Sequence, residues 1–390
     1  MGNEDSDFKS RISSLKGLFL IGSSDIIGSA ISAIFWLLVA SLLLVEEYGQ
    51  ITYFLAIASL AQSVSIIGSP NTLMVYGSKQ PQSIQTLLFL SILASLIISV
   101  IIFLITLKIE IVFLIFAFLF LELSTSVLLG KKLYSIYSKF ILIQKSTQFV
   151  LGIGLFYIIG FDGIIIGICL SSLPFLYIIS KEFRNFKFNF TFLKLKKNFI
   201  TNNYVVFLIS VFRRDIDKII IVPLLGLTVL GNFALSLQVY TILMVISSIS
   251  YKYLVPEDAT GQRNKKLKKF LILISIFIAI ISYFISPIFI ETFFSKYEES
   301  IIAVQIISLT VIPGTIGLIL FSKILSLEKS KYLLIATSIQ LCFIIIGIFS
   351  LGSMFGTLGI AISFLTAQIA YTISLAIINY NLIGEKRFDI

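Results

Sequence analysis

The stretch Ile84–Leu107, IQTLLFLSILASLIISVIIFLITL, decides the fold class of this sequence. It runs for 24 residues without a charged side chain, and about 20 apolar residues are enough for an α-helix to cross the hydrocarbon core of a bilayer. Comparable runs recur along all 390 residues, of which 57% are hydrophobic and only 13% are charged. Because no soluble fold of this length needs so much apolar surface, we predict an all-α integral membrane protein.

Short charged stretches separate about twelve such runs, which we interpret as transmembrane helices in two six-helix bundles. The predicted organisation is a cytoplasmic N-terminus at 1–16, an N-terminal bundle at 17–180, a basic cytoplasmic linker at 181–199, a C-terminal bundle at 200–383 and a cytoplasmic tail at 384–390. The candidate spans are 17–45, 51–77, 84–107, 110–130, 140–160, 163–180, 200–222, 227–254, 270–290, 301–326, 332–351 and 356–383.

The basic residues fall in alternate loops. With the N-terminus inside, the inner segments hold 24 of the 30 Lys and Arg residues, the outer turns hold two and the spans hold four. Cytoplasmic loops are enriched in Lys and Arg because positive charge opposes translocation. The pattern therefore predicts a multi-pass protein of the cytoplasmic (plasma) membrane with both termini inside. It assigns the net charge of +10 to contact with anionic membrane lipids and argues against nucleic-acid binding.

Cysteine and histidine usage excludes several kinds of site. The two cysteines, Cys169 and Cys342, each lie inside an apolar run, and the sequence contains no histidine. These residues cannot build a disulfide framework or a zinc site. Without histidine, carboxylates and lysines are the groups left for proton chemistry near neutral pH. We expect no catalytic residues, no cofactor and no metal, and the sequence leaves open coupling to a proton or sodium gradient.

The two halves of the sequence resemble each other. Glu47-Tyr48-Gly49-Gln50 opens the second span and Val229-Leu230-Gly231-Asn232 opens the eighth, 182 residues later. The sixth span contains Gly167-Ile168-Cys169-Leu170-Ser171 and the twelfth contains Gly359-Ile360-Ala361-Ile362-Ser363, 192 residues later. Two halves in the same orientation would be related by a pseudo-twofold axis along the membrane normal, with a substrate path between them. Chance similarity among apolar segments is the alternative.

Charges within the seventh span are the strongest functional signal, because an ionisable group at bilayer depth is costly unless it faces a cavity or a partner. At about 100° per residue the charges gather on one face of the helix and Asp217 can pair with Arg213 or Arg214. Three cations against two anions leave one positive charge, which suits an anionic phosphate headgroup. A neutralised interhelical network and a position at the outer interface are the alternatives. The charged residues are Arg213, Arg214, Asp215, Asp217 and Lys218.

Three further ionisable residues lie within spans. Asp25 sits in the polar stripe of the first span, where it would either titrate or bind a cation during transport, or pair with a fixed cation in a small-residue packing face. Glu122 lies near the middle of the fourth span, and Lys145 lies about five residues inside the fifth. These two residues would pair with each other, or Lys145 would snorkel to the cytoplasmic surface.

Helix breakers and amides add a weaker signal. Gly68-Ser69-Pro70-Asn71 is predicted to interrupt the second span and Pro313-Gly314 the tenth. Several span amides would hydrogen-bond either sugar hydroxyls or neighbouring helices, the second role being the commoner one. They are Gln62, Asn232, Gln238, Gln305, Gln340 and Gln368.

With these residues in view, the sequence resembles the polysaccharide flippase branch of the multidrug, oligosaccharidyl-lipid and polysaccharide (MOP, MATE-like) exporter superfamily over nearly its whole length. It is shorter than many members, and Gly77-Ser78-Lys79-Gln80 carries one cation where the family often has more. The matching segments are Leu44-Val45-Glu46-Glu47-Tyr48-Gly49, Arg214-Asp215-Ile216-Asp217-Lys218-Ile219-Ile220, Leu225-Gly226 with Leu230-Gly231-Asn232-Phe233-Ala234, and Leu254-Val255-Pro256.

The resemblance implies two six-helix bundles around a central cavity and alternating access for a polyprenyl-phosphate-linked or polyprenyl-diphosphate-linked glycan. Glycan-assembly enzymes would be partners. Two other functions stay open. One is a MATE-type multidrug or small-molecule cation antiporter, which would prefer a cavity rich in carboxylates. The other is a membrane glycan polymerase or glycosyltransferase, which generally needs catalytic groups on a sizeable outer loop, whereas the acidic pairs Glu46-Glu47 and Glu298-Glu299 lie on short turns.

Overall fold

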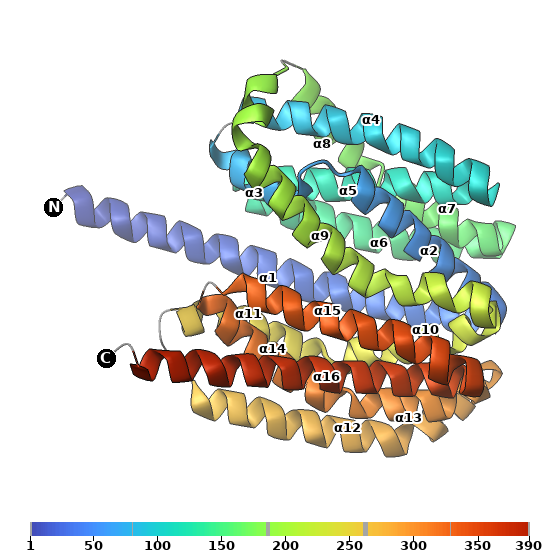
Figure 1. Cartoon of the computed structure of the whole chain (residues 1–390). Helices are drawn as coiled ribbons and strands as arrows, with labels where there is room; N and C mark the ends of the chain where they lie inside the picture. The colour runs from blue at the N-terminus through green and yellow to red at the C-terminus, as the bar shows by residue number, and fades with distance from the viewer. Residues whose placement is uncertain (1, 80, 185–187, 260–263, 328, 389–390) are drawn as a thin grey trace. The chain divides into compact units, whose positions relative to one another are not determined.

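The structure is a computed structural model that describes residues 2–79, 81–184, 188–259, 264–327 and 329–388. Within those ranges every regular element is a helix. The described chain divides into two compact units (Figure 1). Unit 1 comprises Met1–Phe35 and Phe54–Asp215, and unit 2 comprises Trp36–Tyr53 and Ile216–Ile390. The predicted six-helix bundles with their boundaries remain a prediction.

Unit 1 is built around helix α5. In the most apolar window of α5, 61% of the residues are buried, whereas in that of α4 only 22% are. Since α4 is strongly apolar and yet mostly exposed, its outer face is a lipid-facing surface. The helices that contribute to unit 1 are α1 (Gly2–Leu42), α2 (Val45–Ser65), α3 (Ser69–Lys79), α4 (Pro81–Thr106), α5 (Ile109–Gly130), α6 (Tyr134–Ile159), α7 (Phe161–Ser171), α8 (Pro174–Phe183) and α9 (Phe190–Leu225).

Unit 2 contains the rest of α9 and the helices after it, and Figure 1 shows α15 and α16 side by side along their lengths. The end of α1 and the start of α2 also belong to this unit. The remaining helices are α10 (Leu227–Leu243), α11 (Val245–Ala259), α12 (Lys265–Phe293), η1 (Ser295–Ser300), α13 (Ile301–Leu309), α14 (Val311–Ser326), α15 (Ser330–Gly347), η2 (Ile348–Gly352) and α16 (Ser353–Phe388).

The chain is an all-helical multi-pass membrane protein. By length and composition, 8 described helical stretches can cross a membrane, and 10 can if each of two bent pairs is one span. The bent pairs are α2 with α3 and α10 with α11, each with a bend of 50°.

The predicted interruptions of the second and tenth spans are confirmed. Gly68 and Ser69 adopt left-handed backbone with φ of 90° and 75°, and the Ser69 hydroxyl accepts a bond from the Thr72 amide at the start of α3. In the tenth span, α13 ends at Leu309 and α14 begins at Val311. Pro313 explains this break because proline lacks the amide that would bond to the carbonyl four residues earlier.

Helical hairpins with the same local geometry recur in the two units. In unit 1 the chain turns at Gly160, where φ is 70°, and in unit 2 it turns at Gly356, where φ is 57°. Three residues after each turn, Gly163 and Gly359 press against the carbonyls of Leu155 and Leu351, where a Cβ atom has no room. Gly160 and Gly356 are 196 residues apart, as are Gly163 and Gly359. The separation of 192 residues predicted from the sequence is therefore corrected by four residues, or about one helical turn.

A glycine crossing ties α2 to α10 within unit 2. A Cβ atom on Gly49 would overlap the Leu227 carbonyl oxygen, and one on Gly231 would overlap the Val45 carbonyl oxygen. Each glycine thus contacts a carbonyl of the other helix, and that carbonyl lies four residues before the other glycine. The Tyr297 hydroxyl donates to the Ala40 carbonyl at 3.0 Å, which further fixes the end of α1. The repeat-related segments predicted around Gly49 and Gly231 therefore pack directly on each other.

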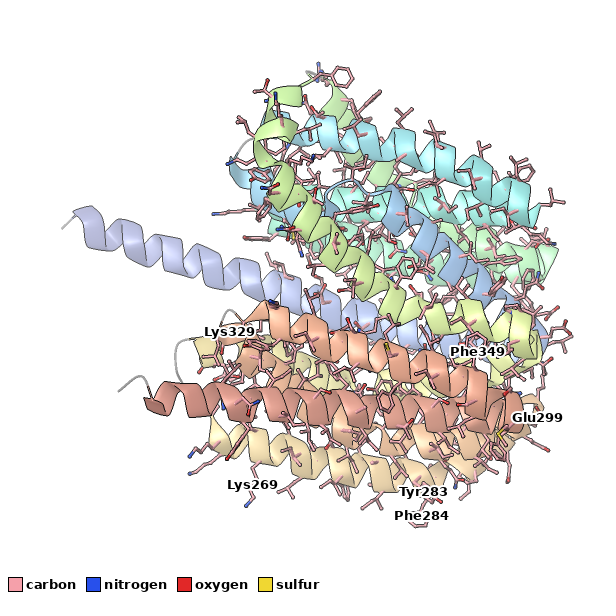
Figure 2. The ribbon with its side chains drawn as sticks, viewed as in Figure 1. Lys269, Tyr283, Phe284, Glu299, Lys329 and Phe349 are labelled. Atoms are coloured by element: carbon pink, nitrogen blue, oxygen red, sulfur yellow. The ribbon has the colours of Figure 1, made fainter. Side chains whose placement is uncertain are left out.

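The two ends of unit 2 carry the residues assigned to opposite sides of the membrane. Figure 2 places Lys269 and Lys329 at one end of the unit and Glu299 and Phe349 at the other. Lys269 and Lys329 belong to predicted cytoplasmic segments, whereas Glu299 belongs to a predicted outer turn. The arrangement of unit 2 agrees with this sidedness.

Candidate functional site

The charge cluster of α9 is held by a serine from α2 in unit 1. The Arg214 guanidinium donates through Nε to Asp215 Oδ2 at 3.1 Å and through a terminal nitrogen to Ser59 Oγ at 2.8 Å. Ser59 in turn donates to Asp215 Oδ2 at 2.8 Å. Asp215 is 7% exposed, while the Arg214 side chain is 64% exposed. The buried carboxylate and hydroxyl thus position a guanidinium that remains accessible.

The next pair of the cluster lies in unit 2. Asp217 is buried, and its Oδ1 accepts bonds from the backbone amide of Lys218 at 2.9 Å and from Lys218 Nζ at 3.3 Å. The sequence predicted pairing of Asp217 with Arg213 or Arg214, and the structure adds two pairs between adjacent residues, Arg214–Asp215 and Lys218–Asp217. Each carboxylate of the cluster therefore has a cation beside it.

Asp25 meets a residue that the sequence did not single out. Asp25 is half-buried on α1, and the Tyr137 hydroxyl of α6 donates to its Oδ1 at 3.1 Å. The charges of Asp25 and Glu122 both act on Tyr137, and the charge of Arg214 acts on Glu122. Helices α1, α5, α6 and α9 therefore bring these four residues into one polar neighbourhood of unit 1.

Lys145 and Glu122 do not form the pair that the sequence suggested. Among the residues that the structure describes, neither side chain makes a hydrogen bond or an ion pair, and both are half-buried. Lys145 packs beside Gly28, one turn from Asp25, where its Cγ lies 3.5 Å from the position of a glycine Cβ. Unit 1 thus holds a cation in its interior that no described carboxylate neutralises directly.

Several span amides bond to neighbouring helices. In unit 2, Gln340 donates to Gln368 at 2.8 Å and Gln305 donates to the Tyr283 carbonyl at 3.1 Å. Asn232 donates to Glu299 at 3.2 Å. In unit 1, the buried Gln62 Nε2 has no hydrogen-bond partner among the described residues. The interhelical role therefore holds for Asn232, Gln305, Gln340 and Gln368 of unit 2, whereas Gln238 makes no hydrogen bond among the described residues and Gln62 keeps a buried donor without a partner.

Comparison with known proteins gives matches at the level of structure. A scan against protein-family models and a search of curated proteins give no match to this sequence. A multidrug resistance MATE family transporter of the MOP superfamily, in its inward-facing conformation, matches with a TM-score of 0.71 at 15% identity, over 92% of this chain and 95% of that one.

Two further solved structures agree with that match. The lipid II flippase MurJ in an inward closed conformation has a TM-score of 0.71 at 15% identity, over 90% of this chain and 86% of that one. The Vibrio cholerae MATE transporter VcmN in its bent form has a TM-score of 0.61 at 14% identity, over 97% and 98%. Identities this low establish the fold and not the cargo. The chain therefore has the fold that these MATE transporters and the lipid II flippase MurJ share.

Proposed function

We propose that this protein is a flippase that moves lipid-linked oligosaccharides or polysaccharide repeat units across the cytoplasmic membrane by alternating access. Its fold likeness to a lipid II flippase supports transport of a large lipid-linked cargo. The cargo would be a glycan on a polyprenyl phosphate or diphosphate, whose headgroup is anionic and rich in hydroxyls.

The observation that carries this proposal is the exposed guanidinium of Arg214 in unit 1. The Arg214 guanidinium is 64% exposed, and Ser59 and Asp215 fix its orientation. A planar guanidinium held in this way suits bidentate bonding to phosphate oxygens. Lys145 adds a second cation with no ion pair among the described residues. Arg213 and Lys218 complete the proposed set of cationic binding residues, and Asp215 and Asp217 act as positioning residues.

Twelve spans would complete the topology. Helix α9 is 36 residues long, which is enough to cross a membrane. It is not among the eight apolar stretches counted above, because its charge cluster lowers its apolar character. The stretch Lys331–Leu382 folds back at Gly356, as the bond between Gln340 and Gln368 shows, so it supplies two spans. The ten spans counted above, a second span from Lys331–Leu382 and α9 together make twelve. An even number of spans would place both termini on the cytoplasmic side.

The test is leaflet translocation of a fluorescent polyprenyl-diphosphate-linked sugar by purified protein in liposomes. Arg214→Ala should lower the initial rate by roughly tenfold or more, because a charge-assisted contact to phosphate is lost. Arg214→Lys should recover only part of the rate, because lysine lacks the planar fork. Lys139→Ala, which removes an exposed cation of α6, is the matched control and should leave the rate unchanged. Unchanged rates in correctly folded Arg214→Ala would refute the proposed headgroup site.

A MATE-type cation antiporter is the second candidate, and the carboxylates of unit 1 favour it. Asp25 and Glu122 are half-buried in the same neighbourhood, and the Glu122 side chain has no ion pair among the described residues. Dye efflux driven by a proton or sodium gradient, lost in Asp25→Asn and retained in Arg214→Ala, would identify the antiporter. The reverse pattern, with translocation of lipid-linked sugar, supports the flippase.

A further inference from the structure

The chain between α8 and the charge cluster of α9 is basic and aromatic. Between Glu182 and Asp215 the sequence contains no acidic residue. The first part of this stretch carries five cations interleaved with phenylalanines, which is the composition of a segment that lies at a membrane surface. The cations are Arg184, Lys187, Lys194, Lys196 and Lys197.

The start of α9 packs against α3 and α4 within unit 1. Asn189 Oδ1 accepts a bond from the Phe192 amide at 3.0 Å, which caps the helix, and the Asn189 amide donates to Thr86 Oγ1 of α4 at 2.9 Å. Phe192 is 4% exposed, and its ring centroid lies 4.8 Å from that of Tyr76. These contacts bury one side of the first turns and determine which side chains remain outside.

The exposed side chains of these turns form what we call the basic face, comprising Lys194, Leu195, Lys196 and Lys197. Leu195 is 75% exposed, and the three lysines are exposed, whereas the ring of Phe199 packs against Tyr76 at 5.6 Å between centroids. None of the three lysines forms an ion pair with a described residue. The basic face therefore offers both positive charge and apolar surface to a partner.

The neighbouring surface of α4 indicates where the basic face lies relative to the bilayer. The ring of Phe188 lies 5.1 Å, centroid to centroid, from that of Phe89, the first of the exposed apolar residues along α4. Those residues continue with Leu93, Ile97, Val100 and Leu104, and they form the lipid-facing side of a span. Because only five residues separate Phe188 from Lys194, the lysines lie near the point where the hydrocarbon surface gives way to headgroups.

We propose that the basic face of α9 binds the headgroups of anionic phospholipids in the cytoplasmic leaflet. The lysines supply the charge complementarity, while Leu195 inserts at the boundary between headgroups and acyl chains. This binding is independent of which cargo the protein moves. It assigns to the N-terminal turns of α9 the task of holding unit 1 against an anionic membrane surface.

The experiment uses the full chain in vesicles of phosphatidylcholine and phosphatidylglycerol. Trp36→Phe removes the single native tryptophan, and Leu195→Trp places a reporter on the basic face. Brominated phosphatidylglycerol should quench the reporter more strongly than brominated phosphatidylcholine. Changing Lys194, Lys196 and Lys197 together to Gln should lower the preference for phosphatidylglycerol roughly tenfold or more, and added salt should also lower it.

Two control variants make the result specific. The matched triple Lys265→Gln, Lys266→Gln and Lys269→Gln removes the same charge from exposed positions at the start of α12 and should leave the preference intact. Changing the three α9 lysines to Arg should retain the preference, which separates loss of charge from misfolding. If the two brominated lipids quench the reporter equally in the protein that carries only Trp36→Phe and Leu195→Trp, the proposal is overturned. The basic face would then be assigned to a soluble partner. An equal effect of the α12 triple would also overturn the proposal.

A soluble phosphate could use the same chemistry as a lipid headgroup. Inorganic phosphate added at the ionic strength of a chloride control should therefore leave the lipid preference unchanged. Abolition of the preference by phosphate alone would assign the basic face to a soluble phosphate and overturn the lipid proposal.

Discussion

At the scale of single residues, Ser59 is the link between α2 and the charge cluster. Its hydroxyl accepts from Arg214 and donates to Asp215, so one small side chain satisfies a buried carboxylate and orients a guanidinium. Serine suits this role because its hydroxyl both donates and accepts. An apolar residue at this position would leave Asp215 with fewer donors in a region where unsatisfied charge is costly.

Ser59→Ala should lower the free energy of unfolding by about 1–2 kcal/mol, because two side-chain hydrogen bonds are lost. The measurement is thermal unfolding of the purified protein in detergent. Ser63→Ala is the matched control, since Ser63 is also buried in α2 but bonds only to the Leu60 carbonyl of its own helix. Equal melting temperatures for the two variants would contradict the linking role of Ser59.

At the scale of elements, close backbone approach decides where helices can pack. Membrane helices associate through small residues that let backbones come together. The crossing of α2 and α10 depends on this, because a Cβ on Gly49 or on Gly231 would overlap a carbonyl oxygen of the other helix. The hairpin glycines Gly163 and Gly359 depend on it in the same way.

Gly231→Ala should destabilise the protein by about 1–3 kcal/mol or more, because the clash is with backbone and cannot be relieved by a rotamer change. Gly154→Ala is the control, since no atom lies within 4 Å of a Cβ at that position of α6. Alanine there should be neutral or stabilising by up to about 1 kcal/mol, since it is the better helix former. Melting temperatures that fall equally in both variants would refute the crossing as the cause.

At the scale of the whole molecule, charge and helix length set the topology. The predicted excess of Lys and Arg on one side would orient the chain as it inserts. The fold itself is shared with transporters at about 15% identity, so it is compatible with widely different sequences. What the fold requires is apolar length, turns at a few glycines and small residues at crossings.

Cysteine labelling tests the twelve-span topology. In a background with Cys169→Ser and Cys342→Ser, Lys132→Cys and Lys329→Cys should react with a membrane-impermeant maleimide only from the cytoplasmic side. Lys108→Cys and Ser353→Cys should react only from outside. The pair Lys329 and Ser353 flanks α15, so reaction of both from the same side would contradict the hairpin of α15 and α16 as two spans.

The sequence by itself determined the membrane class and the breaks near Gly68 and Pro313, and it predicts the sidedness. These are properties of single segments, because apolar length, charge and missing backbone donors act locally. The bend at Met244 could not be predicted, because neither glycine nor proline adjoins the break.

Only the tertiary structure decided which side chains meet. It brought Ser59 to Arg214 and Tyr137 to Asp25, and it shifted the repeat equivalence by one turn. It also left Lys145 and Glu122 without an ion pair to any residue that the structure describes. A helix in a bilayer can rotate and slide without changing its apolar length. Its register is therefore set by packing against other helices, whose residues lie far away in the sequence.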